Sequence, residues 1–178
     1  MAKHVALLRG INVGGHRRIS MPDLRDVLAA AGYEDVVTLL QSGNVVLKGK
    51  GSAKALGPAL EALIDKELGV DPLVVVRTHA ELGAVIDANP FPDAVAHPKL
   101  FHVSFLSAKP KAAVVKELEG ADWAPDRVAF RGREIYADYP DGMQKSKLGR
   151  ALTDKRLGVT ATARNWNTVV KLHELSAS

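Results

Sequence analysis

The sequence of 178 residues contains no cysteine and few aromatic residues. The absence of cysteine excludes disulfides, thiolate nucleophiles and cysteine-based zinc sites. Phe, Trp and Tyr make up only 5% of the chain, so the core has to be built mainly from aliphatic side chains. No apolar run approaches the roughly 20 residues that span a bilayer, and Arg9 and Gly10 interrupt the first apolar stretch. We therefore expect a cytoplasmic protein with no membrane partner.

The residues that are present are typical of a globular protein, with 47% apolar and 25% charged side chains. A chain of this length forms one large domain or two small subdomains. The net charge of +4 permits attraction to polyanions but is weak evidence by itself. The basic and titratable side chains gather in two regions, early at Arg9, His16, Arg17 and Arg18 and late at Lys145, Lys147, Arg150, Lys155, Arg156 and Arg164.

The first half of the sequence predicts the order βαββαβ. Residues 4–9 are an apolar strand, and Ser20 followed by Asp23 marks the start of a helix that Gly32 ends. Residues 36–49 divide into two strands about Ser42 and Gly43, which is typical of a hairpin. A second helix over residues 53–68 and a β-branched strand over residues 72–77 complete the unit.

The same order recurs in the second half, after a proline-rich linker at residues 91–98. We predict a strand over 99–106, a helix over 111–120, a hairpin over 126–140, a helix over 144–158, a strand over 159–164 and a terminal helix over 165–175. Two such units indicate an α+β protein of two tandem ferredoxin-like subdomains with antiparallel sheets. Residues 1–90 form the first and residues 99–178 the second. The halves show no close identity, so the predicted repeat is one of architecture only.

Three stretches resemble the signatures of a known family. They are RGINVGG at residues 9–15, QSGN at residues 41–44 and RNWNTV at residues 164–169. Together they are similar to a widespread bacterial family known only as a domain of unknown function, and the resemblance runs nearly end to end. It implies tandem ferredoxin-like subdomains and carries no established reaction. The family usually has threonine before the RNW motif, where this chain has Ala163.

The opening loop is the first candidate binding site. The backbone N–H groups of Gly10, Gly14 and Gly15 suit an anion, and Asn12 could hold a planar polar ligand. Arg9, Arg17 and Arg18 would supply positive charge. The spacing matches neither a Walker loop nor a dinucleotide fingerprint. The alternative is that the glycines only let the chain turn between a strand and a helix.

The QSGN and RNWN segments are the other candidates. Gln41, Ser42 and Asn44 could face a ligand, although a polar hairpin tip is the simpler interpretation. The RNWN segment places guanidinium and amide donors around an indole that could stack on a base; its residues are Arg164, Asn165, Trp166 and Asn167. The alternative gives these residues a cap, a core plug and an ion pair.

The sequence shows no recognisable catalytic machinery. The six histidines lack metal-ligand spacing, and neither a nucleophile elbow nor a pair of catalytic acids is evident. We expect no metal and no cofactor. The favoured interpretation is a protein that binds RNA, single-stranded DNA or a phosphorylated small molecule. One alternative is an enzyme acting on a small acidic or phosphorylated metabolite in a cleft between the halves. Another is a regulatory or structural protein whose cleft faces a protein partner.

Overall fold

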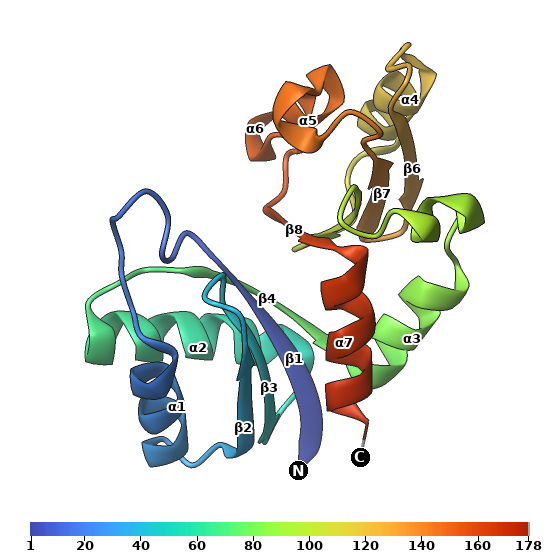
Figure 1. Ribbon diagram of the computed structural model, residues 1–178. Coiled ribbons are helices and arrows are strands. Elements are labelled where there is room, and N and C mark those ends of the chain that lie inside the picture. Colours follow the sequence, from blue (N-terminus) through green and yellow to red (C-terminus); the bar gives the residue numbers. More distant parts are fainter. Residues whose placement is uncertain (178) are drawn as a thin grey trace. The chain divides into compact units, whose positions relative to one another are not determined.

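The computed structural model describes residues 1–177, which fold as two compact units (Figure 1). One unit comprises Met1–Gly83 together with the end of the chain from Leu172, and the other comprises Ala84–Lys171. Each unit contains one four-stranded antiparallel sheet. The α+β class and the two ferredoxin-like units are therefore confirmed. None of the helices in the described part of the chain is long and apolar enough to cross a membrane.

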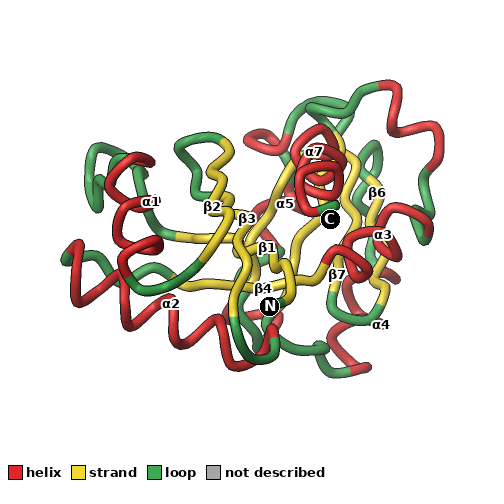
Figure 2. Tube along the Cα trace, turned by 90° about the horizontal axis from the view of Figure 1, so that it is seen from below, coloured by secondary structure: helices red, strands yellow, loops and turns green. Residues whose placement is uncertain are grey.

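The first unit contains six elements before it passes into the second. They are β1 (Ala2–Arg9), α1 (Met21–Ala30), β2 (Glu34–Leu39), β3 (Asn44–Gly49), α2 (Ala53–Leu68) and β4 (Leu73–Thr78). The strand order in the sheet is β2-β3-β1-β4. Helices α1 and α2 lie side by side on one face of this sheet (Figures 1 and 2), where Leu24 and Leu60 join Leu8 and Leu47 in an aliphatic core.

The ends of these helices follow the polar residues that the sequence singled out. The Ser20 hydroxyl accepts a hydrogen bond from the backbone N–H of Asp23 at 3.1 Å, so α1 begins where it was predicted. Ser52 caps α2 in the same way. Gly69 ends α2 in the left-handed conformation that glycine adopts at little cost.

The second unit repeats this order with one more break. Its elements are β5 (Phe101–Leu106), α4 (Ala112–Gly120), β6 (Arg127–Arg131), β7 (Glu134–Asp138), α5 (Lys147–Ala151), α6 (Asp154–Leu157) and β8 (Ala161–Asn165). Helix α7 (Trp166–Ser176) begins in this unit, and its residues from Leu172 on belong to the first. Short 3-10 turns occupy Pro92–Ala96 and Met143–Lys145. The strand order is β6-β7-β5-β8. Leu106, Phe130 and Ile135 of the sheet pack with Leu118 and Leu157.

One helix prediction was wrong, and one helix was not predicted. The single helix expected over 144–158 is divided, because the Thr153 side chain accepts from the N–H of Arg156 and starts a new helix at Asp154. Helix α3 (His79–Asp87) was not predicted. It starts with a reciprocal cap, in which the Glu81 N–H donates to the Thr78 hydroxyl and the Thr78 N–H donates to the Glu81 carboxylate.

The pairing of strands places similar residues at equivalent positions in the two sheets. In the first sheet His4 pairs with Thr78 and Val5 with Arg77. In the second, His102 pairs with Asn165 and Val103 with Arg164. Arg77 and Arg164 are both buried, and each guanidinium donates to the carbonyl of the preceding residue, at 3.0 and 2.8 Å. The repeat is therefore one of buried polar residues as well as of architecture.

The equivalent histidines predict a dependence of stability on pH. Burial lowers the pKa of His4 and of His102 below the usual 6.5, and both ring nitrogens of His4 lack a hydrogen-bond partner within residues 1–177. Because the unfolded chain takes up these protons more readily, the free energy of unfolding should fall as the pH drops below about 6.5. Each histidine contributes a slope of at most about 1.4 kcal/mol per pH unit.

Urea unfolding at a series of pH values tests this expectation. His4→Leu should flatten the loss of stability below about pH 6.5, because it removes a protonation site that the folded state disfavours. His97→Asn is the matched control, since His97 is exposed. An unchanged pH profile in His4→Leu would show that His4 does not contribute to the slope.

Candidate functional site

The opening loop and the hairpin tip lie at the same end of the first sheet. Residues 10–19 follow the last residue of β1, and residues 40–43 join β2 to β3. The loop folds back on itself, with the N–H of Asn12 donating to the carbonyl of Arg17 and the N–H of His16 donating to the carbonyl of Val13, both at 3.0 Å. It is therefore a small turn built on β1 rather than an extended connection.

Asn12 joins the loop to the hairpin tip. Its amide nitrogen donates to the carbonyl of Ile19 at 3.0 Å and to the carbonyl of Gln41 at 2.7 Å. Its amide oxygen accepts from the N–H of Ile19 at 2.9 Å. The Asn12 side chain, which was predicted to hold a planar ligand, thus makes hydrogen bonds to the backbone of both the opening loop and the hairpin tip. These hydrogen bonds fix the shape of the loop.

Gly43 makes the second connection between the two segments. It adopts a φ of +89°, and a Cβ atom there would lie 2.7 Å from Cδ1 of Ile11 and 2.8 Å from Cβ of Leu8. Its carbonyl accepts from the N–H of Leu8 at 2.8 Å. Asn44 is buried, and its amide donates to the carbonyl of Leu39 at 2.7 Å. Within the QSGN motif, then, glycine and asparagine shape the turn.

The exposed part of this end of the sheet is basic. His16, Arg17 and Arg18 are all exposed, as are Gln41 and Ser42 at the tip. Arg9, the last residue of β1, is half-buried opposite Leu73 of β4.

Two of these arginines lie over the loop glycines. A Cβ atom added at Gly10 would lie 3.4 Å from an Nη atom of Arg17. A Cβ atom added at Gly15 would lie 3.6 Å from an Nη atom of Arg18. Arg17 also pairs with Asp71 at 3.1 Å, but both side chains are largely exposed, so this ion pair is worth little.

Several donors of the loop are available to a ligand. Gly14 and Gly15 adopt φ values of +58° and +78° and are exposed. Within residues 1–177, neither their N–H groups nor the guanidinium of Arg18 has a hydrogen-bond or ion-pair partner. Backbone N–H groups beside guanidinium groups are the donors that phosphate oxygens accept from.

The RNWN segment belongs to the second unit. Arg164 is buried, and its guanidinium donates to the Thr162 hydroxyl at 2.7 Å and to the Ala163 carbonyl at 2.8 Å. Burial lowers the pKa of Arg164 to about 10, so the side chain remains charged at neutral pH. These bonds orient the guanidinium along its own strand.

The rest of this segment starts α7. The Asn165 side chain accepts from the N–H of Thr168 at 3.0 Å, which is the cap considered from the sequence. Trp166 is buried and stacks on Phe101 with a centroid distance of 5.0 Å, and Phe101 in turn stacks on Tyr136. Only Asn167 is exposed. The sequence suggested that the Trp166 indole could stack on a base; in the structure it stacks on the buried Phe101.

The part of the chain that matches a known protein family includes the opening loop. The sequence profile of DUF1697, described as a protein of unknown function, matches residues 1–136, which include the opening loop and the hairpin tip. The chain belongs to the DUF1697 family. In this DUF1697 protein the matched residues end before the RNWN segment.

A solved structure has the same fold as this DUF1697 protein. It is a conserved bacterial protein from Streptococcus pneumoniae, with a TM-score of 0.73 and 21% sequence identity, and the similarity covers 98% of each chain. None of the curated proteins compared with the chain matches it. Among residues 1–177, no three histidine, aspartate or glutamate side chains lie close enough together to hold a metal ion.

Proposed function

We infer that this DUF1697 protein binds the phosphate groups of RNA or single-stranded DNA through its opening loop. One observation carries the proposal: the exposed N–H groups of Gly14 and Gly15 and the guanidinium of Arg18 have no partner within residues 1–177. The loop that presents them is held in shape by Asn12. A fixed loop needs little ordering when it binds, which favours affinity.

Single strands suit this surface better than a duplex or a small phosphorylated molecule. Val13 and Leu40 are 66% and 58% exposed on the loop and beside the hairpin tip, and Leu73 is also exposed at this end of the sheet. Apolar side chains beside arginines offer unstacked bases a contact that a duplex backbone cannot use. A small phosphorylated molecule would leave these apolar side chains in water.

The RNWN segment has a supporting role in this proposal. Arg164 and Trp166 stabilise the second unit, and Asn165 starts its last helix. Asn167 is the member of the segment whose exposure leaves it able to touch a ligand.

Substitutions on the loop test the proposal by fluorescence anisotropy. Arg17→Ala and Arg18→Ala should each weaken binding to a labelled single-stranded oligonucleotide and lower the slope of log K against log salt by about one. Asp71→Asn should strengthen binding slightly, because it removes a negative charge beside Arg17 that would repel phosphate. Lys50→Ala is the matched control, since Lys50 is exposed and follows β3 at the opposite end of the sheet.

Two outcomes would contradict the proposal. One is an absence of binding by the unmodified protein at low salt. The other is binding that Arg17→Ala, Arg18→Ala and Lys50→Ala weaken equally, since this would indicate a general effect of charge.

A further inference from the structure

The hairpin tip carries two exposed polar side chains, Gln41 and Ser42, whose donors are unused. The Gln41 side chain is directed toward the opening loop, because its Oε1 atom lies 3.5 Å from Nδ2 of Asn12. Among residues 1–177 the Gln41 side-chain amide makes no other polar contact. Its nitrogen therefore keeps two N–H donors for a ligand, beside the loop that presents the phosphate donors.

The Ser42 hydroxyl complements the Gln41 amide. Its oxygen accepts from the Asn44 amide at 3.2 Å, and Asn44 is itself buried and bonded to the carbonyl of Leu39 at 2.7 Å. The hydroxyl oxygen is therefore held in place, while its hydrogen has no acceptor in the described part of the chain. Together the two side chains offer N–H and O–H donors and, on Gln41, an acceptor oxygen.

The backbone around these side chains is held in an unfavourable conformation. Of the described residues other than glycine, four have a positive φ, and three of the four lie in the loop and the tip: Asn12 at +53°, Arg17 at +52° and Leu40 at +63°. Such conformations persist where the surrounding structure fixes them, and they concentrate at functional sites. A fixed tip has its hydrogen-bonding groups in position before a ligand arrives, which favours affinity.

We propose that Gln41 and Ser42 recognise the ribose 2′-hydroxyl, so that the site selects RNA over single-stranded DNA. The inference rests on the proposed function, in which a phosphate binds at Gly14 and Gly15. In RNA the 2′-hydroxyl is on the carbon next to the one that carries the 3′-phosphate, so the protein groups that bind the two are also neighbours. The loop and the tip are neighbours of this kind, because the Asn12 amide donates to the carbonyl of Gln41 at 2.7 Å.

The chemistry of the tip fits a hydroxyl group. A 2′-hydroxyl is both a donor and an acceptor, and it is the group by which a protein distinguishes RNA from DNA. It donates to the Gln41 oxygen and accepts from the Ser42 hydroxyl. A deoxyribose offers neither bond, so DNA keeps the phosphate contacts and loses those of the tip.

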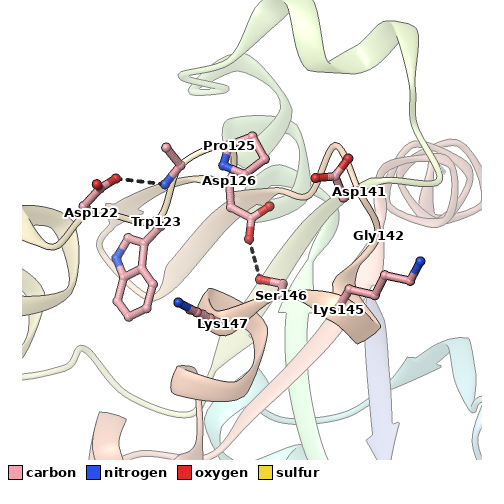
Figure 3. Close-up of a pocket in the computed structure, with 10 residues that line it drawn as sticks. Asp122, Trp123, Pro125, Asp126, Asp141, Gly142, Lys145, Ser146 and Lys147 are labelled. Atoms are coloured by element: carbon pink, nitrogen blue, oxygen red, sulfur yellow. Dashed lines mark hydrogen bonds between the residues drawn. The ribbon is translucent and has the colours of Figure 1, made fainter.

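The second unit contains a cavity of about 300 Å³ that does not suit the same ligand (Figure 3). The charged side chains that line it are Asp122, Asp126, Asp141, Lys145 and Lys147. The Asp126 carboxylate accepts from a neutral donor, the Ser146 hydroxyl, at 2.6 Å, so it keeps its negative charge. Because the lining is negative on balance, it repels phosphate groups. Lys147→Gln should therefore leave RNA binding unchanged.

RNA and DNA strands of one sequence, made of adenine and cytosine only, test the assignment by fluorescence anisotropy. The full chain should bind the RNA roughly five- to tenfold more tightly, the effect of about one net hydrogen bond. An RNA strand with fluorine in place of the 2′-hydroxyl keeps the sugar conformation of RNA but should bind as weakly as DNA. RNA-like affinity of the fluorinated strand would overturn the inference, since the sugar conformation would then be what is recognised.

The same titrations separate this inference from the proposed function. Equal binding of RNA and DNA would overturn the inference and leave the proposed function in place, whereas binding of neither strand would overturn both.

Variants assign the selectivity to the tip. Gln41→Ala and Ser42→Ala should each lower the ratio of RNA affinity to DNA affinity. Arg18→Ala should weaken both ligands by the same factor and keep the ratio, because Arg18 acts on the phosphate. Gln144→Ala is the matched control for Gln41→Ala, since Gln144 is an exposed glutamine of the second unit. A ratio that survives in the double variant of Gln41 and Ser42 would overturn the assignment.

Discussion

Trp166→Ala is expected to lower the free energy of unfolding by about 3–5 kcal/mol, the usual cost of truncating a buried aromatic side chain. The indole is 7% exposed and stacks on Phe101, which is fully buried on the central strand β5. Phe101 also contacts the rings of Tyr136 and Phe91. Removing the indole therefore opens a cavity beside Phe101, whose ring is packed against Tyr136 and Phe91 and cannot readily move to fill it.

Denaturant unfolding followed by circular dichroism measures this loss. Trp166→Phe should keep the stacking and cost much less, while Asn167→Ala, a change at the exposed neighbour, should cost little. A loss of about 0.5 kcal/mol or less in Trp166→Ala, which is the range of ordinary surface changes, would contradict the placement of the indole in the core.

Gly43→Ala is expected to cost about 2–5 kcal/mol, from the strain of a left-handed alanine and from overpacking. Glycine at this position has a φ of +89°. A methyl group would meet Ile11 and Leu8 at under 3 Å, and neither can withdraw easily because both are buried in the core of the first unit. The substitution should also loosen the contact between the hairpin tip and the opening loop, and so weaken oligonucleotide binding.

Gly132→Ala is the control for Gly43→Ala. Gly132 also has a positive φ, +59°, but a Cβ there would meet no atom within 4 Å. Its cost should be that of the backbone alone, about 1–2 kcal/mol. If thermal unfolding gave the two variants the same loss of stability, the close packing of Gly43 against Ile11 would be wrong.

Features that depend on neighbouring residues were predictable from the sequence. The hairpin about Ser42 and Gly43 follows from glycine between two β-branched runs, and the starts of α1 and α2 follow from polar residues before apolar periodicity. The same kind of signal precedes α3, where Thr78 and Glu81 have the spacing of a reciprocal cap. Thr153 likewise marks the break between α5 and α6.

Features that depend on strand pairing were not predictable in the same way. Asn12 reaches Gln41 only because β1 pairs with β3, which sets the loop beside the hairpin tip. Arg77 ends an apolar run in the sequence, yet it is buried, because the register places it opposite Val5 on the central strand. The burial of Trp166 similarly depends on Phe101, 65 residues earlier in the chain.

The location of the bound oligonucleotide tests the central claim most directly. In an NMR titration of the isotope-labelled protein with a short single-stranded RNA at low salt, the amide resonances of Gly14, Gly15, Arg17 and Arg18 should shift, and those of Asn165 and Trp166 should stay in place. Shifts in the RNWN segment without shifts in the opening loop would contradict the account and return the binding site to Arg164 and Trp166.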